Sequence, residues 1–173
     1  MGRMSHAKGI VGQAFRLPLL AIAASGALAL QFLAGCATPQ VDRPAAAQQI
    51  FSAAVKAHND REFDAAAAGY ERILRQYRDQ PGWCAPALRS LGNVRAAQGQ
   101  LAESIRLYDR VGREYATYDW EVLQAWKTAA DLLWDAGREP AARVYYARIV
   151  QRFDKPAEPA VVQTIVRAAK SRR

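Results

Sequence analysis

An internal repeat with a spacing of 38 residues constrains the fold of this chain more than any other feature of its sequence. The clearest copy is the stretch 88–115, in which two amphipathic segments meet at Gly99. The apolar stripe of the second segment consists of Leu101, Ile105, Tyr108, Val111 and Tyr115. Steps of three and four residues place this stripe on one face of an α-helix. Because glycine adopts the left-handed backbone conformation that ends a helix, Gly99 predicts the turn of a helical hairpin.

Copies of this hairpin precede and follow it in the same register. The recurring positions are Tyr70, Tyr108 and Tyr146, then Tyr77, Tyr115 and Phe153, then Gly99 and Gly137. The predicted helix pairs span residues 45–58 and 62–78, 84–98 and 101–115, and 120–136 and 139–153. A single hairpin cannot bury both of its apolar faces, so repeated hairpins stack on one another. The sequence therefore predicts an all-α fold, a solenoid of three helical hairpins.

One more helix is predicted after the third hairpin, over residues 158–170. Its apolar face consists of Val161, Val162, Ile165, Val166 and Ala169. The open end of a solenoid needs a terminal element that covers its apolar side and presents a polar one to water. Residues 156–173 are therefore interpreted as a C-terminal capping helix with a basic tail.

The second hairpin resembles a tetratricopeptide (TPR) repeat. The resemblance rests on the pair Leu91-Gly92, on Gly99, on Ser104 in the place of the usual small residue, and on Tyr108. The usual repeat of that family has about 34 residues, so each join here is about four residues longer. The resemblance covers residues 47–153 and implies a right-handed solenoid of three TPR-like repeats, in a domain that spans 47–155.

The N-terminal segment has the pattern of a secretory signal, with Arg3, Lys8 and Arg16 around an uncharged run that continues to residue 34. The sequence Leu-Ala-Gly-Cys at 33–36 resembles the bacterial lipoprotein box. This resemblance implies a signal peptide over 1–35, a covalent lipid such as palmitate on Cys36, and a tether over 36–46. Ala37 after the cysteine, rather than Asp, implies the inner leaflet of the outer membrane, facing the periplasm. The alternative is an uncleaved membrane helix, but 18 residues fall short of the ~20 that a span needs.

In tetratricopeptide proteins the first helix of each pair lines a concave groove, so the resemblance implies where a partner binds. The corresponding positions are Gln48, Phe51 and Val55, then Arg89, Asn93 and Ala96, then Lys127, Asp131 and Trp134. Arg89 and Asn93 are four residues apart and share one side of a helix. Lys127 occupies the position equivalent to Arg89. These groups predict contacts with the carboxylate or acidic side chains of a peptide. The alternative is that they are merely solvated.

Groups suited to catalysis are scarce. The chain has two histidines, His6 and His58, and the first lies in the signal segment. No motif for a nucleophile, a phosphate loop or a metal site is present, so the sequence predicts no enzyme, no metal and no cofactor besides the lipid. Cys84 lies between Trp83 and Ala85, which favours a packed thiol. The net charge of +8 is spread over helix faces, which does not favour a nucleic-acid partner.

The sequence thus predicts a lipid-anchored periplasmic adaptor or scaffold. We expect it to bind a peptide segment of another cell-envelope protein, in the assembly of an envelope machine for outer-membrane protein insertion, pili or secretion, or polysaccharide export. The alternative is an envelope component that binds an anionic cell-envelope polymer through its basic residues.

Overall fold

The computed structural model describes residues 42–173, which contain seven α-helices and no strand. The helices are α2 (Arg43–Asn59), α3 (Phe63–Gln76), α4 (Pro81–Ala97), α5 (Leu101–Glu114), α6 (Asp119–Asp135), α7 (Glu139–Phe153) and α8 (Ala160–Arg172). The all-α prediction is confirmed over these residues. The predicted signal peptide and Cys36 lie outside the described residues.

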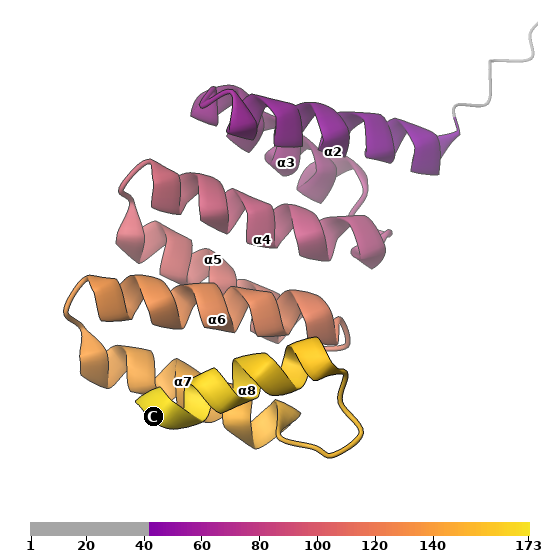
Figure 1. Ribbon diagram of the computed structural model, residues 1–173. Coiled ribbons are helices and arrows are strands. Elements are labelled where there is room, and N and C mark those ends of the chain that lie inside the picture. The colour runs from indigo at the N-terminus through magenta and orange to yellow at the C-terminus, as the bar shows by residue number, and fades with distance from the viewer. Residues whose placement is uncertain (1–41) are drawn as a thin grey trace, which may run out of the picture. The chain divides into compact units, whose positions relative to one another are not determined.

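Each helix packs on the next along the chain, as in a helical-repeat solenoid. Figure 1 shows α2, α4 and α6 side by side in one layer, with α3, α5 and α7 in a second layer behind them. Successive first helices also touch, since α4 contacts both α2 and α6. The helix pairs therefore present two distinct surfaces, one formed by α2, α4 and α6 and one by α3, α5 and α7.

The hairpin turns follow the prediction at two positions and depart from it at one. Gly99 and Gly137 have φ angles of +75° and +71°, the left-handed region that glycine tolerates. The amide of the next residue, Gln100, donates to the Arg95 carbonyl at 2.9 Å and so closes the end of α4. In the first hairpin the same position is Arg61, with φ 64°. The chain therefore makes the same turn there without a glycine.

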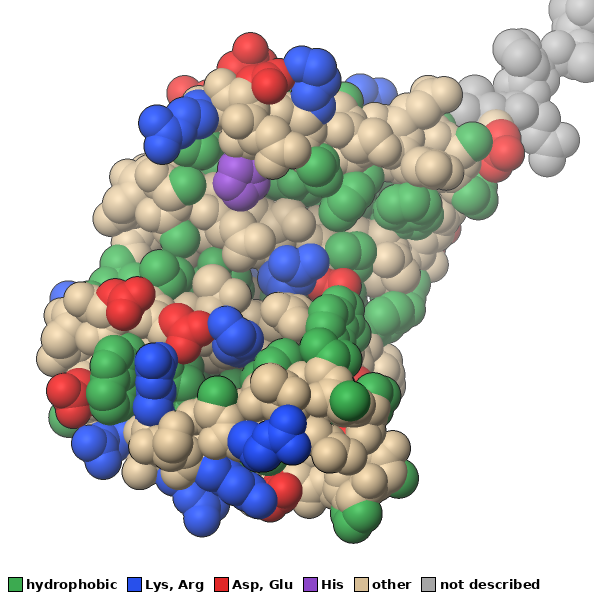
Figure 2. Space-filling model, viewed as in Figure 1, with side chains coloured by type: hydrophobic (Ala, Val, Ile, Leu, Met, Phe, Trp, Pro, Cys, Tyr) green, Lys and Arg blue, Asp and Glu red, His purple; other side chains and the backbone are tan. Residues whose placement is uncertain are grey.

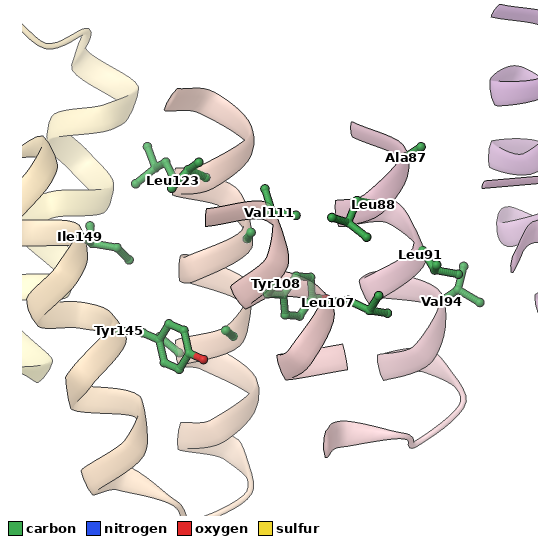
Figure 3. Close-up of a cluster of buried hydrophobic side chains, with 14 of the residues drawn as sticks. Ala87, Leu88, Leu91, Val94, Leu107, Tyr108, Val111, Leu123, Tyr145 and Ile149 are labelled. Atoms are coloured by element: carbon green, nitrogen blue, oxygen red, sulfur yellow. The ribbon is translucent and has the colours of Figure 1, made fainter. Parts of the chain in front are cut away.

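The core lies between the two layers and is built from apolar side chains of consecutive helices. Figure 3 shows Tyr108 and Val111 of α5 between the leucines of α4 and Leu123 of α6. Tyr108 is fully buried because Gly92 leaves room for it: a Cβ at Gly92 would lie 2.6 Å from the tyrosine ring. The Leu-Gly pair that suggested the repeat is thus a site of close helix approach.

The helix boundaries differ from the predicted ones by about three residues or fewer. The largest differences lie at helix starts. Residues 43–46 were predicted as tether, but α2 begins at Arg43 because the Asp42 carboxylate accepts a hydrogen bond from the Ala45 amide at 3.4 Å. α4 begins at Pro81, since proline fits the first turn of a helix.

The last helix packs on α7, as a cap would. Val162, Val166 and Ala169 are buried and Ile165 is partly buried. The prediction is wrong for Val161, which is 53% exposed, because the buried stripe of α8 is narrower than the predicted one. Within residues 42–173, no helix is both long and apolar enough to cross a membrane.

Candidate partner-binding face

The predicted groove residues lie on α2, α4 and α6, on the surface that faces the viewer in Figures 1 and 2. We call the accessible side chains of these three helices the first-helix face. Gln48 and Val55 are exposed, and the other predicted positions are half-buried: Phe51, Arg89, Asn93, Ala96, Lys127, Asp131 and Trp134. The half-buried side chains have partners within the molecule, and these partners determine what the face can bind.

One row of predicted residues bridges successive first helices. Arg89 of α4 donates from Nε to Glu121 of α6 at 2.5 Å, and both side chains are at least three-quarters buried. The equivalent positions one hairpin earlier hold Phe51 and Trp83, whose ring centroids are 6.0 Å apart. Arg89 therefore already binds a carboxylate, and a peptide carboxylate would have to displace Glu121. The sequence prediction missed Glu121 and Trp83, although their spacing of 38 residues marks them as equivalent.

A second row is anchored on tyrosines of the helices behind. The hydroxyl of Tyr108 donates to Asn93 Oδ1 at 2.8 Å, and the hydroxyl of Tyr146 donates to Asp131 Oδ1 at the same distance. Burial raises the pKa of both phenols, which therefore remain protonated donors. The aromatic register that indicated core packing thus also positions polar groups on the first-helix face.

In the third hairpin, charged groups of the face pair with one another. Lys127 Nζ lies 2.7 Å from Asp131 Oδ2. Arg172, at the end of α8, also reaches this carboxylate and lies over the Trp134 ring, 5.4 Å from its centroid. Lys127 is therefore not a free cation for a peptide carboxylate. Arg172 was not predicted as part of this site, because nothing in its local sequence places it there.

The charges of the first-helix face are mostly neutralised in place. Figure 2 shows basic and acidic side chains adjoining one another across this surface, with hydrophobic side chains between them. The more accessible predicted positions, Gln48 and Val55, are uncharged. Such a surface suits contacts with a polar or apolar peptide rather than a carboxylate clamp.

Two hollows lie outside this face. The first, of about 580 Å³, is at the N-terminal end of the helical array, lined mainly by alanines of α2 and α3 with Ile50 and Arg72. The second, of about 590 Å³, lies between α3 and α5 and contains Arg75, Arg78, Arg95 and Arg110 with three glutamates. Because those glutamates offset most of the arginine charge, the second hollow does not favour an anionic polymer.

The aromatic side chains at the starts of α4 and α6 have different environments. Trp83 packs against Phe51, as expected for a residue at the join between hairpins. Trp120, one residue from the equivalent position, is 48% exposed. It lies in the first turn of α6 and extends the accessible surface at that end of the helix.

Cys84 is a packed residue. It is fully buried, and its thiol donates to the Tyr77 carbonyl at 3.1 Å. Burial raises the pKa of the thiol, which keeps it protonated and unreactive. Over the residues that the structure describes, no group of three His, Cys, Asp or Glu side chains is arranged to hold a metal ion.

Comparison with known proteins assigns no family. No family model matches the chain, and no curated protein matches it significantly. The functional argument therefore rests on the sequence and the geometry alone.

Proposed function

We propose that the chain is a non-enzymatic, lipid-anchored adaptor of the periplasm that binds a segment of another cell-envelope protein on its first-helix face. The observation that carries the proposal is the layer of α2, α4 and α6, which exposes three helices side by side over the length of the array. Side chains that bridge these helices or reach back to α5 and α7 hold the surface in one shape. A rigid surface loses little entropy when it binds an extended segment.

We also propose that the array is a right-handed solenoid of three TPR-like repeats with a period of 38 residues. The helix starts support this period: α2, α4 and α6 begin at residues 43, 81 and 119, and α3, α5 and α7 begin at 63, 101 and 139. α8 begins at 160 rather than 157, so the last helix has the place of a cap and not of a fourth regular repeat.

The membrane anchor is proposed from the lipoprotein-like sequence that ends at Cys36. Acyl chains on this cysteine would hold the protein on a bilayer, since each buried methylene adds about 0.8 kcal/mol. A Cys36→Ala chain is expected to leave the membrane fraction on carbonate washing, whereas the natural chain remains. Retention of the Cys36→Ala chain would refute the anchor.

Partner binding is tested with matched substitutions on the two surfaces. Val55 lies on the first-helix face, and Val144 lies on α7; they are 37% and 50% exposed. We expect Val55→Glu to reduce recovery of a crosslinked partner from intact envelopes at least tenfold, because a carboxylate then faces the bound segment. Val144→Glu is the control and is expected to leave recovery unchanged. Equal recovery with both variants would contradict the proposed face.

A further inference from the structure

The C-terminal end of the first-helix face contains a site that already holds a guanidinium group of the chain itself. Arg172 Nη1 lies 3.1 Å from the Tyr146 hydroxyl oxygen and 3.4 Å from Asp131 Oδ1, and its guanidinium lies over the Trp134 ring. An aromatic face, a carboxylate and a phenol oxygen together match the needs of a planar cation with several N–H donors. We propose that this site, the Arg172 site, takes an arginine side chain of a partner in place of Arg172.

The charges around the site favour a cation. Lys127 neutralises one carboxylate, but Asp131 and Asp135 together leave an excess of negative charge when Arg172 is withdrawn. The hydrogen bond to Tyr146 raises the pKa of Arg172, and the carboxylates of Asp131 and Asp135 add to this effect. A second arginine, Arg143, has its guanidinium 5.9 Å from the centroid of the Trp134 ring and is engaged with Glu139.

Arg172 can leave the site without uncovering the core. The buried residues that hold α8 on α7 are Val162, Val166 and Ala169, all earlier in the helix. Lys170 also pairs with Asp154 at 2.7 Å, independently of the site. The Arg172 side chain is 47% exposed, and exchange of such an exposed ion pair for an equivalent one costs little.

The other hairpins lack this arrangement, so the site distinguishes one end of the face. The positions equivalent to Asp131 and Trp134 hold Asn93 and Ala96 in the second hairpin, and Val55 and His58 in the first. A bound segment would thus place its arginine at the α6 end of the face. The inference rests on the proposed function, because it names the chemistry of one end of the same face.

The test uses the full chain labelled with 5-fluorotryptophan, whose four tryptophans give four resonances. A Trp134→Phe chain assigns the line of Trp134. The probes are the acetylated and amidated peptide Ala-Ala-Arg-Ala-Ala and its citrulline analogue, in which a neutral urea of the same shape replaces the guanidinium. We expect the arginine peptide to shift the Trp134 line of an Arg172→Ala chain, with half-saturation at a concentration at least tenfold lower than in the natural chain.

The controls separate a guanidinium site from general stickiness. The citrulline peptide should produce no shift, and Asp131→Asn in the Arg172→Ala chain should weaken binding at least tenfold. Arg172→Gln, which keeps most of the side chain, should behave like Arg172→Ala, and Arg173→Ala should behave like the natural chain. Equal shifts with both peptides, or equal half-saturation with and without Arg172, would overturn the proposal. Because this readout concerns Trp134 alone, its failure leaves the recovery experiment at Val55 unaffected.

Discussion

The two ends of the helical array are finished in different ways. At the C-terminal end, α8 covers α7 and sends Arg172 onto the first-helix face. At the N-terminal end, over the residues that the structure describes, the outer side of α2 and α3 is an open hollow. Ala53 is exposed there, whereas the equivalent residues of the later hairpins, Leu91 and Ala129, are buried.

The difference shows how a repeat array can leave one end open. The N-terminal hairpin keeps the apolar pattern of the others but fills the outward positions with small residues: Ala53, Ala57, Ala65, Ala68 and Gly69. Equivalent positions in the second hairpin include the buried leucines Leu91 and Leu107. Small side chains expose little apolar area to water, so the open end costs less than a row of leucines would. The other end, with larger side chains, requires a covering helix.

The sharpest test of this comparison places the same change at equivalent positions. Ala129→Asp is expected to lower the free energy of unfolding by more than about 3 kcal/mol, because it buries an unpaired carboxylate. Ala53→Asp should cost less than about 0.7 kcal/mol, the loss in helix propensity. Urea denaturation measures both. A large loss at Ala53 would mean that the N-terminal end is covered in solution.

A second test concerns the cap itself. Val166→Ala is expected to lower the free energy of unfolding by about 2 kcal/mol, since it removes two buried methyl groups at the α7–α8 contact. Val161→Ala is the control on the same helix and should have almost no effect, because Val161 is exposed. Equal losses would show that α8 packs differently, with Val161 in the contact as the sequence pattern predicted. Thermal or urea denaturation of the two chains decides between these arrangements.

Alkaline pH acts on a feature that both ends share. Tyr70 and Tyr146 are equivalent buried residues, and burial raises the pKa of each phenol above the ordinary value of 10.0. The folded chain then holds its protons where the unfolded chain loses them, so stability falls as pH rises above 10. The limit is about 1.4 kcal/mol per pH unit for each tyrosine. Urea titrations at pH 9, 10 and 11 check the sign, and an increase in stability would contradict the burial of these phenols.

The hairpin turns give the smallest expected effect. Arg61→Gly should raise the free energy of unfolding by about 1 kcal/mol, because glycine relieves the cost of the left-handed backbone. Gly137→Arg should lower it by a similar amount at the equivalent turn. Urea denaturation of both chains measures the pair, and a loss of stability in Arg61→Gly would show that the arginine side chain stabilises the first turn.

The sequence was sufficient to predict the helices and much of their packing. Periodic apolar stripes and the glycines of the turns act within a single hairpin, so the helices were found to within about three residues. The tyrosine register also predicted which side of each second helix is buried, as Tyr70, Tyr108 and Tyr146 confirm.

The candidate site was predictable only in part. The helices that form the face follow from the repeat, but the partners of its side chains do not. Arg89 was expected to be free for a carboxylate, yet its distance to Glu121 depends on how closely α4 and α6 pack. Arg172 lies 41 residues from Asp131, and its position depends on the length of the loop before α8. Contacts of this kind arise from three-dimensional packing and leave no periodic signal in the sequence.

The most direct test of the central claim, that α2, α4 and α6 bind a segment of another envelope protein, is site-specific photo-crosslinking in intact cells. A photoreactive benzoylphenylalanine replaces either Val55 on the first-helix face or Val144 on α7, both of which are exposed. The account predicts one adduct of discrete mass from position 55 and none from position 144. Adducts of equal yield from both positions, an adduct from position 144 alone, or none from position 55 would contradict it.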